Sequence, residues 1–308
     1  MKEKILIDTD LGSDVDDALA LLFALKSPRL SLEGITTVYG KTDLRAKIAK
    51  KMVDYADADI PVYAGAGNPL TPNTFIWHTG REGEGILAPE EYLKPLAGME
   101  IGADAADFLI KKVMSAPHQY NLVTIGGLTN IAQMLLKEPR TEGKIKHIYM
   151  MGGAISFPEE LDLEKIIPAS EPEHNIRCDI EAARIVFNSK TPKTLLPIDT
   201  TAKVPIDRED FEYLHGKGPC EDAVKKMVDV WFDYRDGHFG RRVGYTCMHD
   251  PLTVAAVVYP SLLKQKEMPL IVDSQGLTQI SEQGKPVNLC YDVDRYKFRR
   301  IFLETILA

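Results

Sequence analysis

The chain has 308 residues, enough for one large domain or two of ordinary size. Its 37 Lys and Arg residues face 45 Asp and Glu residues, which gives a net charge of −8 without any basic block. Nucleic-acid binding requires a cationic face, so the composition argues against such a partner. The chain shows neither a signal-peptide pattern nor an apolar run long enough to span a membrane, and its four Cys residues are widely spaced. These features predict a cytoplasmic protein with reduced thiols.

Short apolar runs alternate with amphipathic stretches along most of the chain. The runs predicted as strands are residues 4–7, 34–38, 61–64, 121–125, 146–151 and 194–198. The stretches predicted as helices are residues 17–26, 43–57, 103–115, 129–137, 180–189, 220–236 and 252–258. A pair of strands at 269–273 and 286–292 and a closing helix at 294–307 complete the predicted elements.

Runs this short, bounded by Gly and Pro, suit parallel strands that are buried on both faces. Their alternation with helices predicts the α/β fold class: a single domain over residues 1–308, with a mainly parallel central sheet flanked by helices. Long loops near residues 70–100 and 154–175 are expected to stand over this sheet. Ligands of such sheets bind beyond the carboxyl ends of the strands.

A crowded group of carboxylates stands between the first predicted strand and the first predicted helix, formed by Asp8, Asp10, Asp14, Asp16 and Asp17. Like charges that share a site raise one another's pKa, so such crowding is costly unless a cation neutralises it. Carboxylate oxygens suit calcium or magnesium better than zinc. Capping of the helix is the alternative for Asp14 and Asp16, but it leaves Asp8 and Asp10 unexplained.

Other polar residues follow later strands. Glu173 and Asn175 would point the same way in an extended segment, and would offer an acceptor and an amide to sugar hydroxyls. His249 precedes Asp250 at a predicted helix start, and its ordinary pKa near neutrality suits a general acid. Aromatic side chains around His78 and at 231–234 offer faces on which a base can stack. Each of these residues alone is also compatible with a capped helix, a solvated loop or an ordinary core.

Taken in order, these segments resemble the inosine–uridine-preferring nucleoside hydrolases over nearly the whole chain. The motif that carries the resemblance best is DTDLGSDVDDALAL at residues 8–21. Further matching segments are TTVYG at 36–40, GGLTN at 126–130, MGGA at 151–154, EHNI at 173–176, DIEAA at 179–183 and HDP at 249–251. The resemblance implies the nucleoside hydrolase-like fold with a Rossmann-like core. It also implies cleavage of the N-glycosidic bond of ribonucleosides with calcium, and a homodimer or homotetramer.

The resemblance also assigns roles to individual residues. Calcium would be bound by the carboxylates of Asp10, Asp17 and Asp250 and by the backbone carbonyl of Ile125, with Asp14 as an alternative ligand. Asp10 would act as general base toward a calcium-bound water, and His249 would protonate or hydrogen-bond the departing base. The residues expected to hold the sugar hydroxyls are Asp16, Glu173 and Asn175.

The chain departs from the family pattern in three places. Two additional residues separate Gly12-Ser13 from the paired carboxylates at 16–17. Lys41 stands where the family usually has Asn, and as a point charge it would pair with Asp14, weaken calcium binding or meet an anionic group of the substrate. His174 stands at a position that is often aromatic. We therefore count Lys41, His78 and His174 among the candidate substrate contacts.

The sequence thus predicts a hydrolase that releases ribose and a free base from a small-molecule nucleoside, with no nucleic-acid or membrane partner. Lys41 favours two alternatives: a metal-bound ribosyl-binding protein with little turnover, or a hydrolase of a modified or anionic ribosyl compound. The DxD pattern at residues 8–10 also fits a phosphatase of the haloacid dehalogenase type, but that class leaves the HDP segment at 249–251 unexplained.

Overall fold

The computed structural model describes residues 2–72, 78–155 and 170–308. Across these residues runs a ten-stranded sheet with the strand order β11-β10-β12-β7-β6-β5-β1-β2-β3-β4. Its strands are β1 (Glu3–Thr9), β2 (Leu30–Thr37), β3 (Val62–Ala64), β4 (Gly102–Ala103), β5 (Tyr120–Thr124), β6 (His147–Met151), β7 (Lys193–Leu196), β10 (Leu263–Val272), β11 (Thr278–Ile280) and β12 (Lys285–Val293). The pairs from β4 to β12 are parallel, and β10 runs antiparallel to β11 and β12. Two short strands, β8 (Pro205–Asp207) and β9 (Tyr245–Cys247), form a separate antiparallel pair.

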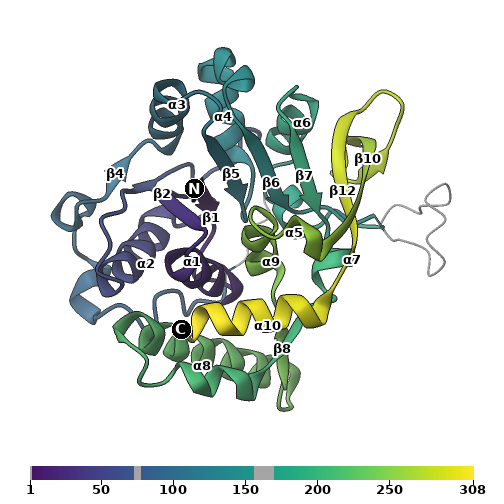
Figure 1. Ribbon diagram of the computed structural model, residues 1–308. Helices are drawn as coiled ribbons and strands as arrows, with labels where there is room; N and C mark the ends of the chain where they lie inside the picture. Colours follow the sequence, from purple (N-terminus) through teal and green to yellow (C-terminus); the bar gives the residue numbers. More distant parts are fainter. Residues whose placement is uncertain (1, 73–77, 156–169) are drawn as a thin grey trace.

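Helices cover both faces of the large sheet (Figure 1). One layer contains α3 (Ala105–Ser115), α4 (Thr129–Lys137) and α6 (Ile180–Asn188). The other contains α1 (Asp16–Lys26), α2 (Thr42–Tyr55), α8 (Pro219–Phe239), α9 (His249–Ala256) and α10 (Arg295–Ile306). The short helices α5 (His174–Cys178) and α7 (Ile198–Thr201) lie in connections. Short 3-10 helices are formed by Pro89–Tyr92, Leu96–Met99, Pro139–Gly143, Arg208–Leu214 and Pro260–Leu262.

Alternation along the central strand explains this three-layer arrangement. Ile5 and Ile7 pack into the core beneath α1, α2 and α9, whereas Leu6 packs into the core beneath α3, α4 and α6. Successive side chains of a strand point to opposite faces, so a strand that is buried on both faces must be apolar throughout. This is why the middle of β1, residues 5–7, is an uninterrupted apolar run.

The order in which the strands are added creates a switch point beside β1. The chain first adds β2, β3 and β4 on one side of β1, and then returns to add β5, β6 and β7 on the other side. β1 therefore pairs in parallel with both β2 and β5. The connections that leave β1 and β5 diverge at this point, and they open a crevice at the carboxyl ends of the two strands. The residues that follow these strands, from Asp10 onward and from Ile125 onward, border that crevice.

The structure confirms the predicted α/β class with a mainly parallel sheet, the antiparallel pair of late strands, and the closing helix, which Asp294 caps through the backbone N–H of Lys297. The prediction of an extended polar segment around Glu173 and Asn175 is wrong, because Glu173 caps α5 and Asn175 lies within the first turn of that helix. Much of the loop predicted at 154–175, and residues 73–77 of the other loop, lie outside the described residues. Within the described ranges, we find no helix with the length and hydropathy needed to cross a bilayer.

Candidate active site

A cavity of about 380 Å³ opens at the carboxyl ends of β1, β5 and β6. Its lining residues are Asp10, Ser13, Asp14, Asp16, Asp17, Ile125, Met151, Glu173, His174, Asn175, Ile198, His249 and Asp250. The structure therefore brings together nearly every residue that the sequence singled out. Two of the predicted contacts, Lys41 and His78, are not among the lining residues.

Local folding brings distant carboxylates into this cavity. α1 begins at Asp16, directly after the loop that leaves β1, and α9 packs against α1 at the other end of the sequence. The backbone N–H of Asp250 donates to Asp16 Oδ2 at 3.3 Å, which fixes the start of α9 against the start of α1. Asp17 is held by the hydroxyl of Thr9, which donates to its carboxylate. The acids thus project from rigid elements instead of from a loose loop.

Three of these acids form a compact oxygen cluster. In the described residues, one carboxylate oxygen each from Asp16, Asp17 and Asp250 lie within 4.8 Å of one another. Each of these side chains is only 4% exposed. Burial, followed by repulsion from the neighbouring carboxylates, raises the pKa of all three well above the ordinary value. A divalent cation would relieve that repulsion and take oxygen ligands of the kind it prefers, so the donor set fits a hard metal ion.

The cluster differs in one member from the predicted metal ligands. Asp16, which was expected to hold sugar hydroxyls, belongs to the compact trio, whereas Asp10 lies beside it. Asp10 is close enough for its charge to raise the pKa of Asp17, and Ile125 lines the cavity from the end of β5. The division of roles between Asp10 and Asp16 therefore stays a prediction.

Asp10 is the exception among the clustered acids, because its pKa is lowered. Burial alone would raise this pKa, but a hydrogen bond with His174 and the positive charges of Arg45 and His174 outweigh burial. His174 Nε2 lies 3.7 Å from Asp10 Oδ2, and the pKa of His174 is raised by this carboxylate despite its own burial. An ionised carboxylate in a buried cavity is suited to accept a proton.

Glu173 and Asn175 reach the cavity from α5 and not from an extended strand. The carboxylate of Glu173 accepts from the backbone N–H groups of Gly153 at 2.9 Å, Asn175 at 3.0 Å and Ile176 at 3.3 Å. The amide of Asn175 donates to the carbonyl of Met151 at 3.1 Å. Both side chains are thereby oriented by the backbone, as a binding site for hydroxyl groups requires.

His249 is buried at the start of α9 and lines the cavity. Its Nδ1 atom lies 2.7 Å from the hydroxyl of Thr201. Burial lowers the pKa of His249 to about 4, so the imidazole is neutral at pH 7. Of the two roles predicted for His249, the hydrogen-bond donor therefore fits this neutral imidazole better than the charged acid.

The two predicted contacts that lie outside the cavity, Lys41 and His78, both adjoin Gly40. Lys41 is exposed and immediately precedes α2. Its predicted ion pair with Asp14 does not form within the described residues. His78 packs beside Tyr39, with ring centroids 6.1 Å apart, and its Nδ1 atom lies 3.7 Å from Glu82.

Arg45 is a buried residue beside the candidate site that the sequence did not single out. It is only 1% exposed, and its charge lowers the pKa of Asp10. The signal was available, because Arg45 shares the buried face of α2 with Ile48, Ala49 and Met52 at helical spacing. An arginine on such a face needs an internal reason to be there.

Aromatic side chains of α8 adjoin the cavity near Asp14. Trp231 and Tyr234 stack with ring centroids 5.7 Å apart and line a small adjacent pocket together with Ser13 and Asp14. Phe232, from the same predicted aromatic segment, is buried in the core. The other predicted aromatic face, Trp77, lies outside the described residues.

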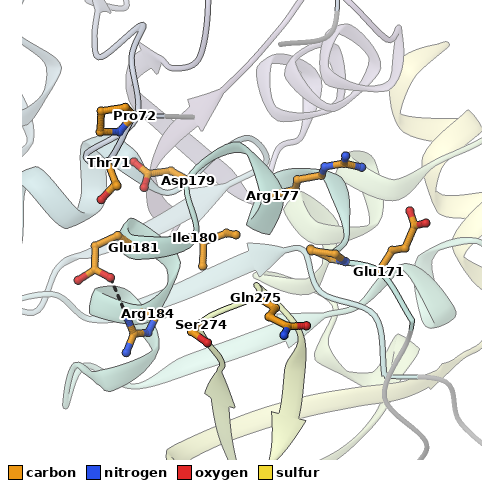
Figure 2. A pocket seen from close by; sticks show the side chains of 11 residues that line it. Thr71, Pro72, Glu171, Arg177, Asp179, Ile180, Glu181, Arg184, Ser274 and Gln275 are labelled. Atoms are coloured by element: carbon orange, nitrogen blue, oxygen red, sulfur yellow. Dashed lines mark hydrogen bonds and ion pairs between the residues drawn. The ribbon is translucent and has the colours of Figure 1, made fainter. Parts of the chain in front are cut away.

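A larger cavity of about 700 Å³ lies beyond the other end of α5 and is lined by none of the clustered aspartates (Figure 2). Several of its charged groups are engaged within the protein: Arg184 donates to Glu181 at 2.9 Å, as the dashed line in Figure 2 marks. Asp179 caps α6 through the N–H of Ala182 and accepts from Thr129. The smaller, carboxylate-lined cavity is therefore the candidate active site.

A carboxylate-lined cavity at the switch point of an α/β sheet is the architecture of a small-molecule enzyme. The sequence model of the family described as "Inosine-uridine preferring nucleoside hydrolase" matches residues 5–300. Uridine nucleosidase 1 of Arabidopsis thaliana is 32% identical over 283 residues, covering 89% of this chain and 80% of that protein. The chain belongs to the inosine-uridine preferring nucleoside hydrolase family.

Solved structures show the same fold. A plant nucleoside hydrolase, the PpNRh1 enzyme, superposes with a TM-score of 0.83 and 26% identity over 100% of both chains. A purine-preferring ribonucleoside hydrolase from Gardnerella vaginalis gives a TM-score of 0.82 and 25% identity over 99% of this chain and 98% of that chain. The resemblance drawn from the sequence motifs is thus confirmed.

The metal-free protein should lose stability as the pH rises from about 4 to about 7. Burial raises the pKa of Asp8 to about 7 and that of Asp14 to about 6, above the ordinary value near 4. The folded state thus keeps protons that the unfolded state has released, and the stability they contribute is lost as the pH rises through 6 and 7. Thermal unfolding in chelator measures this. Asp8→Asn should flatten the dependence, and a Tm that rises over this interval would contradict it.

Gly126→Ala should impair the site while sparing the fold. An added Cβ would lie 2.8 Å from the backbone nitrogen of Asp10 and 2.9 Å from its Oδ1 atom, so Asp10 must move. Misplacement of a reacting group by about 1 Å costs about 100-fold in kcat/KM. The overpacking should also lower the free energy of unfolding by about 1–3 kcal/mol. Gly143→Ala is the matched control, because its Cβ meets no atom within 4 Å. Equal nucleoside hydrolysis by both variants would show that Asp10 needs no fixed position.

Proposed function

We propose that this chain hydrolyses the N-glycosidic bond of ribonucleosides to ribose and a free base, with calcium in the carboxylate cluster. The observation that carries the proposal is the convergence of one low-pKa carboxylate, a compact acid trio and oriented hydroxyl-binding groups in a single cavity. Its volume falls within the range of about 300–1,000 Å³ that is usual for small-molecule sites. Family membership supports the same reaction.

The chain's own groups supply most of the chemistry. A calcium ion, when bound, would polarise a water molecule and the sugar hydroxyls. Asp10 stays ionised at neutral pH and takes the proton of the attacking water, with His174 holding its carboxylate. As the bond to the base lengthens, positive charge develops on the ribose, and the surrounding carboxylates stabilise it.

Glu173 and Asn175 orient the ribose, because their positions are fixed by backbone hydrogen bonds before any substrate arrives. His249, neutral and buried, donates a hydrogen bond to the departing base as negative charge builds there. Trp231 and Tyr234 line the small adjacent pocket, which shares Ser13 and Asp14 with the cavity, and they are the aromatic rings nearest to that side of the site.

Calcium is preferred to zinc on the chemistry of the donors. The candidate ligands are carboxylates and one backbone carbonyl, which are hard oxygen donors. Zinc sites would normally include His or Cys, whereas His249 is held by Thr201. Removal of calcium should therefore abolish hydrolysis.

The cellular setting is also part of the proposal. All four Cys residues are free thiols, and Cys178, Cys220 and Cys290 are buried. Free thiols are typical of a reducing compartment, which supports a cytoplasmic enzyme. The homodimer or homotetramer implied by the resemblance stays a prediction.

Asp10→Asn should lower kcat by about 10²- to 10⁴-fold, because the amide cannot accept the proton of the attacking water. The fold should persist, since Asn is of nearly the same size. Asp104→Asn is the control: it removes the same charge from the cap of α3, outside the cavity, and should keep wild-type turnover. Wild-type kcat in Asp10→Asn would remove Asp10 from the mechanism.

A hydrolysis screen tests the function as a whole. Inosine, adenosine, uridine, cytidine and nicotinamide riboside are each incubated with calcium or with chelator, and released ribose is measured by its reducing end. We expect ribose release that the chelator stops, and the ranking of bases gives the specificity. Tight ribose binding without release would instead support a ribosyl-binding protein. Silence on all five, with calcium bound, would favour a modified or anionic substrate.

A further inference from the structure

His249 lines the cavity with one of its two ring nitrogens already bound to the protein. Its Nδ1 atom lies 2.7 Å from the hydroxyl of Thr201. In the described part of the chain no group bonds to Nε2, so Nε2 is the ring nitrogen that remains for a substrate. A neutral imidazole carries its proton on one nitrogen only. The bond at Nδ1 therefore decides whether Nε2 donates or accepts a hydrogen bond.

The surroundings of this ring favour the neutral imidazole. Among the described residues, the histidines with a carboxylate oxygen within 4.0 Å are His78, His174 and His215, and His249 is not one of them. A cation bound by the nearby carboxylates would make an imidazolium still less favourable, because the two positive charges would repel each other. The question at His249 is thus which nitrogen holds the single proton.

The other contacts of Thr201 decide the direction of the hydrogen bond. Thr201 is 0% exposed, so its hydroxyl proton needs an acceptor within the protein. The carbonyl of Ile198 lies 3.5 Å away, beyond the usual range of about 2.5–3.0 Å for such a bond. That carbonyl already accepts the backbone N–H of Ala202 at 2.8 Å. Nδ1 is therefore the acceptor for the Thr201 hydroxyl, and the imidazole proton is left on Nε2.

The short helix α7 holds the hydroxyl of Thr201 in place. The N–H of Ile198, at the start of α7, donates to the carbonyl of Gly153 at 2.9 Å. The hydroxyl of Thr200 donates to the carbonyl of Cys290 at 2.9 Å. α7 is thereby tied both to the chain that follows β6 and to β12. Thr201 is thus presented from an anchored element, as the support of a functional group requires.

We propose that Thr201 is a positioning residue that holds the imidazole of His249 in the tautomer with its proton on Nε2. This inference rests on the proposed hydrolysis of ribonucleosides. When the glycosidic bond breaks, its electron pair passes to the base, while water supplies the oxygen that replaces the base on the ribose. The Nε2–H group stabilises the negative charge on the base by a hydrogen bond. The opposite tautomer would present a lone pair there and repel the base.

Nitrogen NMR of protein labelled in its histidine rings tests the tautomer directly. At pH 7 we expect a protonated Nε2 and an unprotonated Nδ1 in the wild-type chain, with the signals of His249 assigned by their loss in His249→Gln. A protonated Nδ1, in a neutral ring or in an imidazolium, would overturn the inference. The readout needs neither substrate nor turnover.

Thr201→Val removes the hydroxyl at nearly constant volume and tests the role in the reaction. The kcat for uridine or inosine should fall about 10- to 100-fold, because the base departs without an oriented donor. A nitrophenyl riboside has a leaving group that needs no such help, so its hydrolysis should change by less than about threefold. Thr201→Ser keeps the hydroxyl and should recover most of the lost rate. An equal loss on both kinds of substrate would show that Thr201 only supports the fold.

Thr253→Val is the matched control. Thr253 is also 0% exposed, and its hydroxyl donates to the backbone carbonyl of His249 at 3.1 Å instead of to the ring. The substitution thus removes a buried hydroxyl beside the same residue. It should leave both the tautomer and the dependence on the leaving group unchanged. A change in either, as large as in Thr201→Val, would contradict a specific role for Thr201.

The two measurements together separate this inference from the proposed function. Ribose release by the wild-type chain, together with a protonated Nδ1, would reject only the role of Thr201. Absence of ribose release from every nucleoside and from the nitrophenyl riboside would reject the proposed function, whatever tautomer the NMR spectrum shows.

Discussion

Mutual repulsion of buried carboxylates is the constraint on which this active site depends. Carboxylate oxygens of Asp16, Asp17 and Asp250 lie within 4.8 Å of one another, although the raised pKa of each carboxyl shows that its ionisation is unfavourable there. Proteins tolerate such an arrangement only where packing holds the groups in place and charge of the opposite sign is supplied. Here the packing comes from the contact between α1 and α9, and the charge comes from Arg45, His174 and the metal ion that the site fits.

The topology explains why this repulsion is located beside β1. β1 lies between β2 and β5, and the connections that leave β1 and β5 diverge. The carboxyl ends of these strands therefore leave room for a cavity without disturbing the core. The cores above and below the sheet remain continuous, with Ile5 and Ile7 on one face and Leu6 on the other. The clustered carboxylates thereby lie at the carboxyl end of the sheet, where the rest of the fold can support them.

The sequence was sufficient for the fold class and for most of the site. Apolar runs that alternate with amphipathic stretches define the parallel sheet, and the acids that follow β1 mark its functional edge. The segment around Glu173 was misread because a single-turn helix leaves no periodic pattern, although Glu173 is a capping residue by type. Spacing along the sequence could not show that Asp16, and not Asp10, joins Asp17 and Asp250 in the trio. The packing of α9 against α1 decides which carboxylates meet.

Lys41 was the predicted cation near the site, but the structure buries Arg45 there instead. This difference shows which features of a site the sequence spacing can predict. Lys41 is a predicted substrate contact because it stands where the family usually has Asn, yet it precedes α2 and faces solvent. Arg45 is one helical turn further along and lies on the face that carries Ile48 and Met52 into the core. Proximity in sequence to a motif places a charge near the site. The phase of the helix decides whether that charge enters it, and on α2 that phase brings in a guanidinium whose planar donors can hold two loops at once.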